Sequence, residues 1–83
     1  MEIKVLGPGC ANCKRLYAEV EKAVAQSGQP ATITKVEKME EIAAAGILRT
    51  PGLVIDGKVV SSGRVPNAPE IATMITSALA PKA

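Results

Sequence analysis

The 83-residue sequence contains no histidine, phenylalanine or tryptophan, and Tyr17 is its single aromatic residue. Without histidine, no imidazole is present to act as a general base. Without further aromatic side chains, the chain lacks the platforms on which the bases of single-stranded nucleic acids stack. Its net charge of +2 arises from 10 basic and 8 acidic residues spread along the chain. We therefore expect an aliphatic core and no nucleic-acid partner.

Long apolar segments are also missing. The start of the chain, Met1 to Leu6, alternates apolar and charged residues and lacks the apolar stretch of about 7–15 residues found in signal peptides. No apolar run approaches the ~20 residues of a membrane span. Length and composition predict a single domain over residues 1–83 that is cytoplasmic, monomeric and without membrane contact.

Cysteine is scarce as well, but its placement is specific. The two cysteines, Cys10 and Cys13, are separated by two residues. In a reducing compartment such a pair indicates a catalytic or metal-binding site, and a disulfide that closes so short a loop would stabilise the fold little. A closed zinc site needs four ligands, of which one chain without histidine offers two. We therefore expect no resident metal and no cofactor.

The first part of the chain predicts a strand followed by a helix. Residues 1–6 have the two-residue period of a half-buried strand, and Gly7-Pro8-Gly9 ends it. From Cys10 onward the period becomes helical, and Gly28 suits the left-handed position after the last turn. Arg15 and Glu19 have the spacing of an ion pair along a helix. The apolar face consists of Cys13, Leu16, Tyr17, Val20 and Val24.

The rest of the chain predicts two further helices and three strands. Residues 31–36 are rich in β-branched side chains, although their alternation is poor, and residues 37–45 predict a short helix with Met39, Ile42 and Ala43 on one side. Asp56-Gly57 between residues 53–55 and 58–61 is a strong hairpin signal. Asn67 with Glu70 resembles a capping box that opens a final helix. Its apolar stripe is Ile71, Met74, Ile75 and Leu79.

The predicted order is therefore β-α-β-α-β-β-α. The first βαβ unit requires a parallel strand pair with a right-handed crossover, and the hairpin adds antiparallel strands. The sequence thus predicts an α/β domain with a mixed four-stranded sheet.

The position of the two cysteines favours disulfide exchange. Cys10 falls at the predicted start of the first helix, where unpaired N–H groups and the helix dipole stabilise an anion. A lowered pKa increases the fraction of reactive thiolate, and Lys14, four residues later, is a candidate for additional stabilisation. Cys13 shares the apolar helix face, so we expect it to be less exposed. This asymmetry predicts that Cys10 attacks and Cys13 resolves the mixed disulfide.

Three segments resemble the small archaeal and bacterial glutaredoxin-like thioredoxins of minimal length. They are residues 7–13 (GPGCANC), 50–57 (TPGLVIDG) and 63–65 (GRV), and the similarity runs from Met1 to about Leu79. The resemblance implies a minimal thioredoxin-like fold, a reversible Cys10–Cys13 disulfide and a cis proline at Pro51 beside it. It also implies a redox carrier with two partners, a disulfide-containing substrate protein and a reductase of the thioredoxin-reductase type or another dithiol donor. The residues expected to border the substrate groove are Thr50, Pro51, Gly63 and Arg64.

Two alternatives use the same cysteines differently. A Cys-x-x-Cys between a first strand and a first helix also occurs in heavy-metal-associated domains, where the thiolates bind soft ions such as Cu(I). Those domains have the order β-α-β-β-α-β, whereas this chain is predicted to end on a helix. The second alternative is a non-catalytic interaction domain in which the pair senses oxidation.

Overall fold

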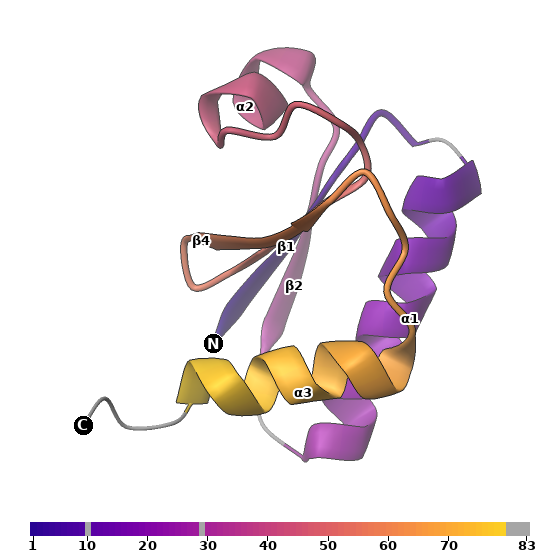
Figure 1. Cartoon of the computed structure of the whole chain (residues 1–83), viewed down its shortest axis with the longest axis vertical. Coiled ribbons are helices and arrows are strands. Elements are labelled where there is room, and N and C mark those ends of the chain that lie inside the picture. Colours follow the sequence, from indigo (N-terminus) through magenta and orange to yellow (C-terminus); the bar gives the residue numbers. More distant parts are fainter. Residues whose placement is uncertain (10, 29, 80–83) are drawn as a thin grey trace.

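The computed structural model describes residues 1–9, 11–28 and 30–79, which form four strands and three helices (Figure 1). Their order is β-α-β-α-β-β-α, as the sequence predicts. Among the described residues, the helices are too short or too polar to cross a bilayer. The elements are β1 (Glu2–Leu6), α1 (Ala11–Ser27), β2 (Thr32–Val36), α2 (Met39–Ala44), β3 (Gly52–Ile55), β4 (Lys58–Ser62) and α3 (Ala68–Leu79).

The four strands form one mixed sheet in the order β2-β1-β3-β4. β1 and β2 are parallel and are joined through α1, while β3 is antiparallel to both β1 and β4. The turn between β3 and β4 has positive φ angles at Asp56 (49°) and Gly57 (82°), the conformation that an Asp-Gly hairpin favours. The carboxyl end of β1 and the amino end of β3 therefore lie side by side, since Leu6 pairs with Gly52.

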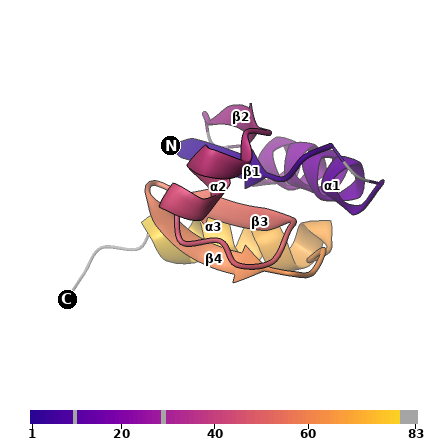
Figure 2. The ribbon, with the colours of Figure 1, turned by 90° about the horizontal axis from the view of Figure 1, so that it is seen from above.

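Helices cover both faces of the sheet (Figure 2). One face packs against α1 and α3 through a cluster that includes Val5, Leu16, Leu53 and Ile71, all buried. On the other face Leu6 and Val54 pack with Ile42 of α2 and with Ile47. The alternation of strand residues between these two clusters explains why β3 is buried on both sides.

The structure corrects several details of the predicted helices. In α1 the buried residues are Cys13, Leu16, Val20 and Ala23, with Tyr17 and Val24 packed at the rim. Glu19 forms its ion pair with Lys22, three residues away, and not with Arg15. In α2 only Ile42 is buried, while Met39 is 61% exposed and Ala43 is also exposed. The inward face of this six-residue helix is occupied by Ile42, which packs with Leu6, Ile47 and Val54. The Cys10 end of the first helix and the Leu79 side chain lie outside the described residues.

The start of α3 contains a capping bond and an ion pair. The Asn67 side-chain oxygen accepts a hydrogen bond of 3.0 Å from the Glu70 backbone N–H, which confirms the predicted N-cap. The Glu70 carboxylate does not complete the capping box, because it pairs with the guanidinium of Arg64 in the preceding loop. This pair links the β4–α3 loop to the helix.

The Arg64–Glu70 pair should make stability sensitive to acid. A hydrogen bond from Arg64 lowers the pKa of Glu70 in the folded protein. Its contribution is therefore present above the unfolded pKa of about 4.3 and is lost as pH falls through the folded value. We expect Glu70→Gln to lower the Tm slightly at neutral pH, and the difference from wild type to shrink as the pH falls below about 4. Thermal unfolding across pH measures this. Glu21→Gln, which changes an exposed α1 carboxylate, should show no such convergence, and an equal response of both variants would contradict the assignment.

Candidate active site

The Cys13 side chain lies in the first turn of α1 and is 6% exposed. It packs against the backbone of Gly7, the residue that follows β1. A Cβ atom placed on Gly7 would lie 2.2 Å from the Cys13 Sγ and 3.2 Å from its Cβ. Since real Cβ atoms do not approach sulfur so closely, only glycine at this position leaves room for the thiol. The Gly-Pro-Gly segment therefore does more than end the strand.

Pro51 also lies next to Gly7. Its Cα is 3.8 Å from the position that a Gly7 Cβ would occupy, so Pro51 and the Cys13 thiol both lie beside Gly7. The Thr50–Pro51 peptide bond is cis, as the family resemblance implies. Pro51 is buried, and its carbonyl oxygen accepts a hydrogen bond of 3.0 Å from the Gly63 N–H. The structure thus brings together Cys13, Pro51 and Gly63, which are far apart in the sequence.

Cys10 itself lies outside the described residues. In the sequence it follows Gly9 and directly precedes Ala11, the first residue of α1. The first turn of α1 carries no acidic residue. The first turn of the helix itself therefore contributes no negative charge that would oppose a thiolate there.

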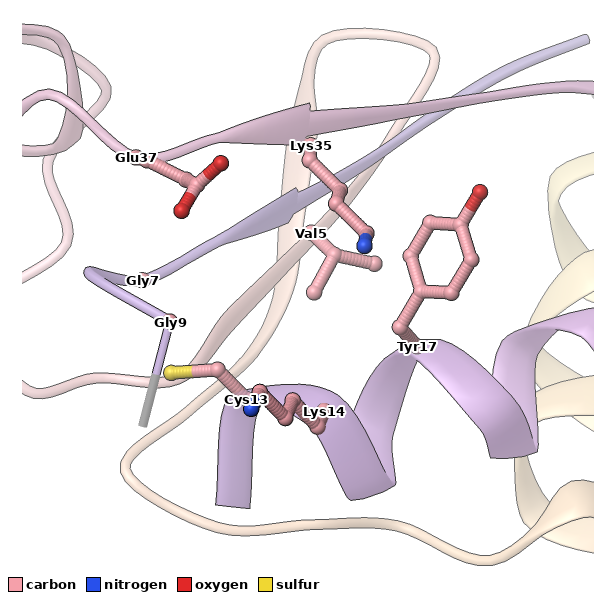
Figure 3. A pocket seen from close by; sticks show the side chains of 8 residues that line it. All are labelled: Val5, Gly7, Gly9, Cys13, Lys14, Tyr17, Lys35 and Glu37. Carbon is pink, nitrogen blue, oxygen red and sulfur yellow. The ribbon is translucent and has the colours of Figure 1, made fainter. Parts of the chain in front are cut away.

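A small pocket of about 80 Å³ opens beside Cys13 on the β2 side of the site (Figure 3). In Figure 3 the Cys13 sulfur points from α1 toward the Gly7–Gly9 segment, and Lys35 and Glu37 lie across the pocket from it. The volume suffices for a few water molecules. The residues that line it are Val5, Gly7, Gly9, Cys13, Lys14, Tyr17, Lys35 and Glu37.

The sheet register explains how Lys35 and Glu37 reach this pocket. Lys35 is the partner of Val5 in the β1–β2 ladder, and Val5 is buried against α1, so Lys35 faces the same helix. Its Nζ lies 4.5 Å from the centre of the Tyr17 ring, in a cation–π contact. The Glu37 carboxylate reaches the Gly7–Gly9 segment, since a Cβ on Gly9 would lie 3.2 Å from its Oε2. Neither residue is predicted as part of the site from the sequence, where the poor alternation of residues 31–36 is the one signal at Lys35.

Comparison with known proteins identifies the family. The sequence profile described as "Thioredoxin domain" matches residues 1–76. A thioredoxin of Methanothermobacter thermautotrophicus is 37% identical over 76 residues, which cover 92% of this chain and 99% of that protein. A thioredoxin of Methanocaldococcus jannaschii is 38% identical over 77 residues, 93% of this chain and 88% of that protein. The chain belongs to the thioredoxin family. It is therefore a thiol–disulfide oxidoreductase in the general sense of that family.

Within this thioredoxin-family fold, the remaining predicted site residues have distinct surroundings. Lys14 is exposed and lines the pocket beside Cys13. Thr50 is half-buried next to Pro51, and Gly63 is bonded to Pro51. Arg64 instead forms the ion pair with Glu70, so its guanidinium is already paired with a carboxylate of α3. Among the described residues, no group of three or more cysteine, aspartate or glutamate side chains could hold a metal ion.

The ammonium of Lys35 should favour the thiolate form of Cys13. Unit charges about 5–10 Å apart in a solvent-like medium interact by about 0.4–0.8 kcal/mol, or about two- to fourfold in an equilibrium constant. In a Cys10→Ser background, Lys35→Met should therefore raise the pKa of the Cys13 thiol and slow its reaction with uncharged iodoacetamide at neutral pH by about that factor. The rate of alkylation against pH measures this. Lys58→Met, which changes an exposed lysine on β4, is the matched control, and an unchanged profile for Lys35→Met would contradict the expected influence.

Proposed function

We propose that the chain catalyses dithiol–disulfide exchange through Cys10 and Cys13, with Cys10 as the attacking and Cys13 as the resolving thiol. The observation that carries this proposal is the environment of Cys13, which is buried in the first turn of α1 and packed against Gly7 and beside Pro51. A buried thiol suits intramolecular attack better than attack on a large substrate. The residue before α1 in the sequence is the better candidate for the first attack, because helix N-termini stabilise thiolates.

The exchange proceeds in two steps that conserve electrons. The Cys10 thiolate attacks one sulfur of the substrate disulfide, and the other sulfur leaves as a thiolate that takes up a proton from water. The Cys13 thiol then loses its proton to water, and its thiolate attacks Cys10 in the mixed disulfide and releases the second substrate thiolate. The substrate gains two electrons, and the protein is left with a Cys10–Cys13 disulfide. A reductase or another dithiol donor returns the two electrons.

The substrate groove in this proposal runs beside Pro51. Thr50 and Pro51 line it, and Gly63, bonded to the Pro51 carbonyl, lies on the same side together with Arg64. An extended substrate backbone would lie along Thr50 and Pro51 in this proposal. The partners are a protein that carries a disulfide and a reductase of the thioredoxin-reductase type, and the protein acts as a monomer in the cytoplasm.

A turnover assay tests the proposal against a metal-binding role. The purified protein should reduce insulin disulfides catalytically with dithiothreitol, or with a thioredoxin-reductase or glutathione system, as the electron source. Metal content is measured on the same protein, purified under reducing conditions. Absence of turnover with every donor, together with one soft metal ion bound per one or two chains, would overturn the proposal in favour of a metal-binding module.

A further inference from the structure

The loop before Pro51 holds a strongly exposed apolar side chain. Leu48 is 96% exposed, more than Met39 at 61% or Val59 at 40%. Its position is fixed from both sides, because Ile47 is buried and Pro51 is buried. The side chain of Ile47 packs over Gly52, where a Cβ would lie 2.6 Å from its Cδ1. Leu48 is therefore held outward by an anchored loop and does not belong to a loose terminus.

Arg49 places a positive charge next to Leu48. A Cβ on Gly63 would lie 3.0 Å from the Cβ and 3.2 Å from the Cδ of Arg49, so the stem of this arginine lies over Gly63. The Gly63 N–H donates a hydrogen bond to the Pro51 carbonyl, so Arg49 lies close to Pro51 and to the candidate substrate groove. Within residues 1–9, 11–28 and 30–79, the ion pairs are Lys4–Glu2, Lys22–Glu19 and Arg64–Glu70. Arg49 has no carboxylate partner in this set.

The charged side chains near the candidate groove favour an acidic partner. Lys14 and Arg15 are exposed in the first turns of α1, and neither takes part in the three ion pairs of the described residues. Glu37 reaches the Gly7–Gly9 segment from the other side of the pocket, where Lys14 and Lys35 also lie, and Glu40 and Glu41 belong to the first turn of α2. Leu48 and Arg49 thus offer an apolar and a cationic side chain next to each other in the loop before Pro51.

We infer that Leu48 and Arg49 form a specificity site for the polypeptide that carries the substrate disulfide, and that they select a segment with an apolar residue next to an acidic one. The inference rests on the proposed exchange function and names its substrate class. Apolar contact with Leu48 removes surface from water, while Arg49 pairs with the carboxylate and discriminates against basic segments. The side chains of Leu48 and Arg49 take no part in the thiol exchange itself. They therefore change the preference among substrates and not the chemistry of the reaction.

The test compares peptides that contain one internal disulfide and differ only in two flanking residues, Leu-Glu, Leu-Lys or Ser-Glu. The protein variants are Arg49→Glu and Leu48→Ser. The matched controls are Lys58→Glu and Val59→Ser, an adjacent cationic and apolar pair on β4 at the opposite end of the sheet from Gly52. We measure kcat/KM for each peptide at low and high salt.

Wild type should prefer the Leu-Glu over the Leu-Lys peptide by up to about fivefold, as expected for an exposed charge pair, and added salt should reduce this ratio. Arg49→Glu should reverse the preference, and Leu48→Ser should reduce kcat/KM for the Leu-Glu peptide by about five- to tenfold and leave the Ser-Glu peptide unchanged. The control variants should keep the wild-type pattern.

Equal rates of wild type on all three peptides, or the same pattern in Arg49→Glu as in wild type, would overturn this inference alone. Failure of wild type to reduce any peptide would overturn the proposed function as well.

Discussion

Cys13→Ser should retain its substrate as a mixed disulfide, and turnover should fall by more than about 100-fold. The proposed attack forms a bond between Cys10 and one substrate sulfur, and the thiol of Cys13 is needed to break it. Serine keeps the size of the buried side chain but is no nucleophile toward a disulfide at neutral pH. The adduct is measured by mass spectrometry of the intact protein after exposure to a peptide disulfide, with and without dithiothreitol.

The reciprocal variant separates the two roles. Cys10→Ser should lose turnover to the same extent and form no adduct, because the remaining thiol of Cys13 is 6% exposed and packed against Gly7. The double variant controls for non-specific binding of the peptide. Faster adduct formation by Cys10→Ser than by Cys13→Ser would reverse the roles. If neither variant forms an adduct while both lose tight metal binding, the metal-binding hypothesis gains support.

The order of the elements could be predicted because most of them carry a local signal. β1 alternates apolar and charged residues, Gly28 follows α1 with a φ of 68°, and Asp56-Gly57 forms the expected turn. The parallel pairing of β1 with β2 then follows from the crossover through α1. These features depend on residues close together in the sequence, so periodicity and turn chemistry are sufficient to find them.

The pocket beside Cys13 could not be predicted, because it depends on pairing between strands. β2 is an edge strand, and its five residues are in turn exposed, half-buried, exposed, exposed and half-buried. Its residues alternate poorly because the part of the strand that faces α1 ends at the pocket, where polar side chains are tolerated. Only the register that sets Lys35 against Val5 shows that this lysine lies at the pocket. The sequence predicts only Lys14, as a candidate for stabilising the Cys10 thiolate, and the structure places Lys14 and Lys35 at the pocket beside Cys13.

The importance of Gly7 was also outside the reach of sequence patterns. Gly7-Pro8-Gly9 predicts a break in the chain, and the structure confirms that β1 ends at Leu6. A turn signal, however, says nothing about which atom occupies the space next to a glycine. That space is filled by the Sγ of Cys13, which comes from the following helix. This close approach makes position 7 sensitive to any added side chain.

Gly7→Ala should both destabilise the protein and change the chemistry of Cys13. The new Cβ would lie 2.2 Å from the Sγ, so one of the two must move. The backbone is held by the hydrogen bond of 2.8 Å from the Gly7 N–H to the Val36 carbonyl oxygen. We therefore expect the Cys13 side chain to be displaced, at a cost of about 1–3 kcal/mol in the free energy of unfolding. Denaturant unfolding measures this cost, and alkylation of Cys13 in a Cys10→Ser background measures its exposure.

A second glycine separates this effect from general overpacking. Gly52→Ala would bring a Cβ within 2.6 Å of the Ile47 side chain, in the cluster that packs against α2, and should also reduce stability by about 1–3 kcal/mol. It should leave the alkylation rate of Cys13 and the rate of resolution close to wild type. Gly7→Ala should accelerate the alkylation and slow the resolution. In a Cys13→Ala background the penalty of Gly7→Ala should shrink, because the colliding sulfur is gone and only the contact with the Cβ at 3.2 Å remains. An undiminished penalty in that background would mean that the cost of filling position 7 arises from the backbone and not from the thiol.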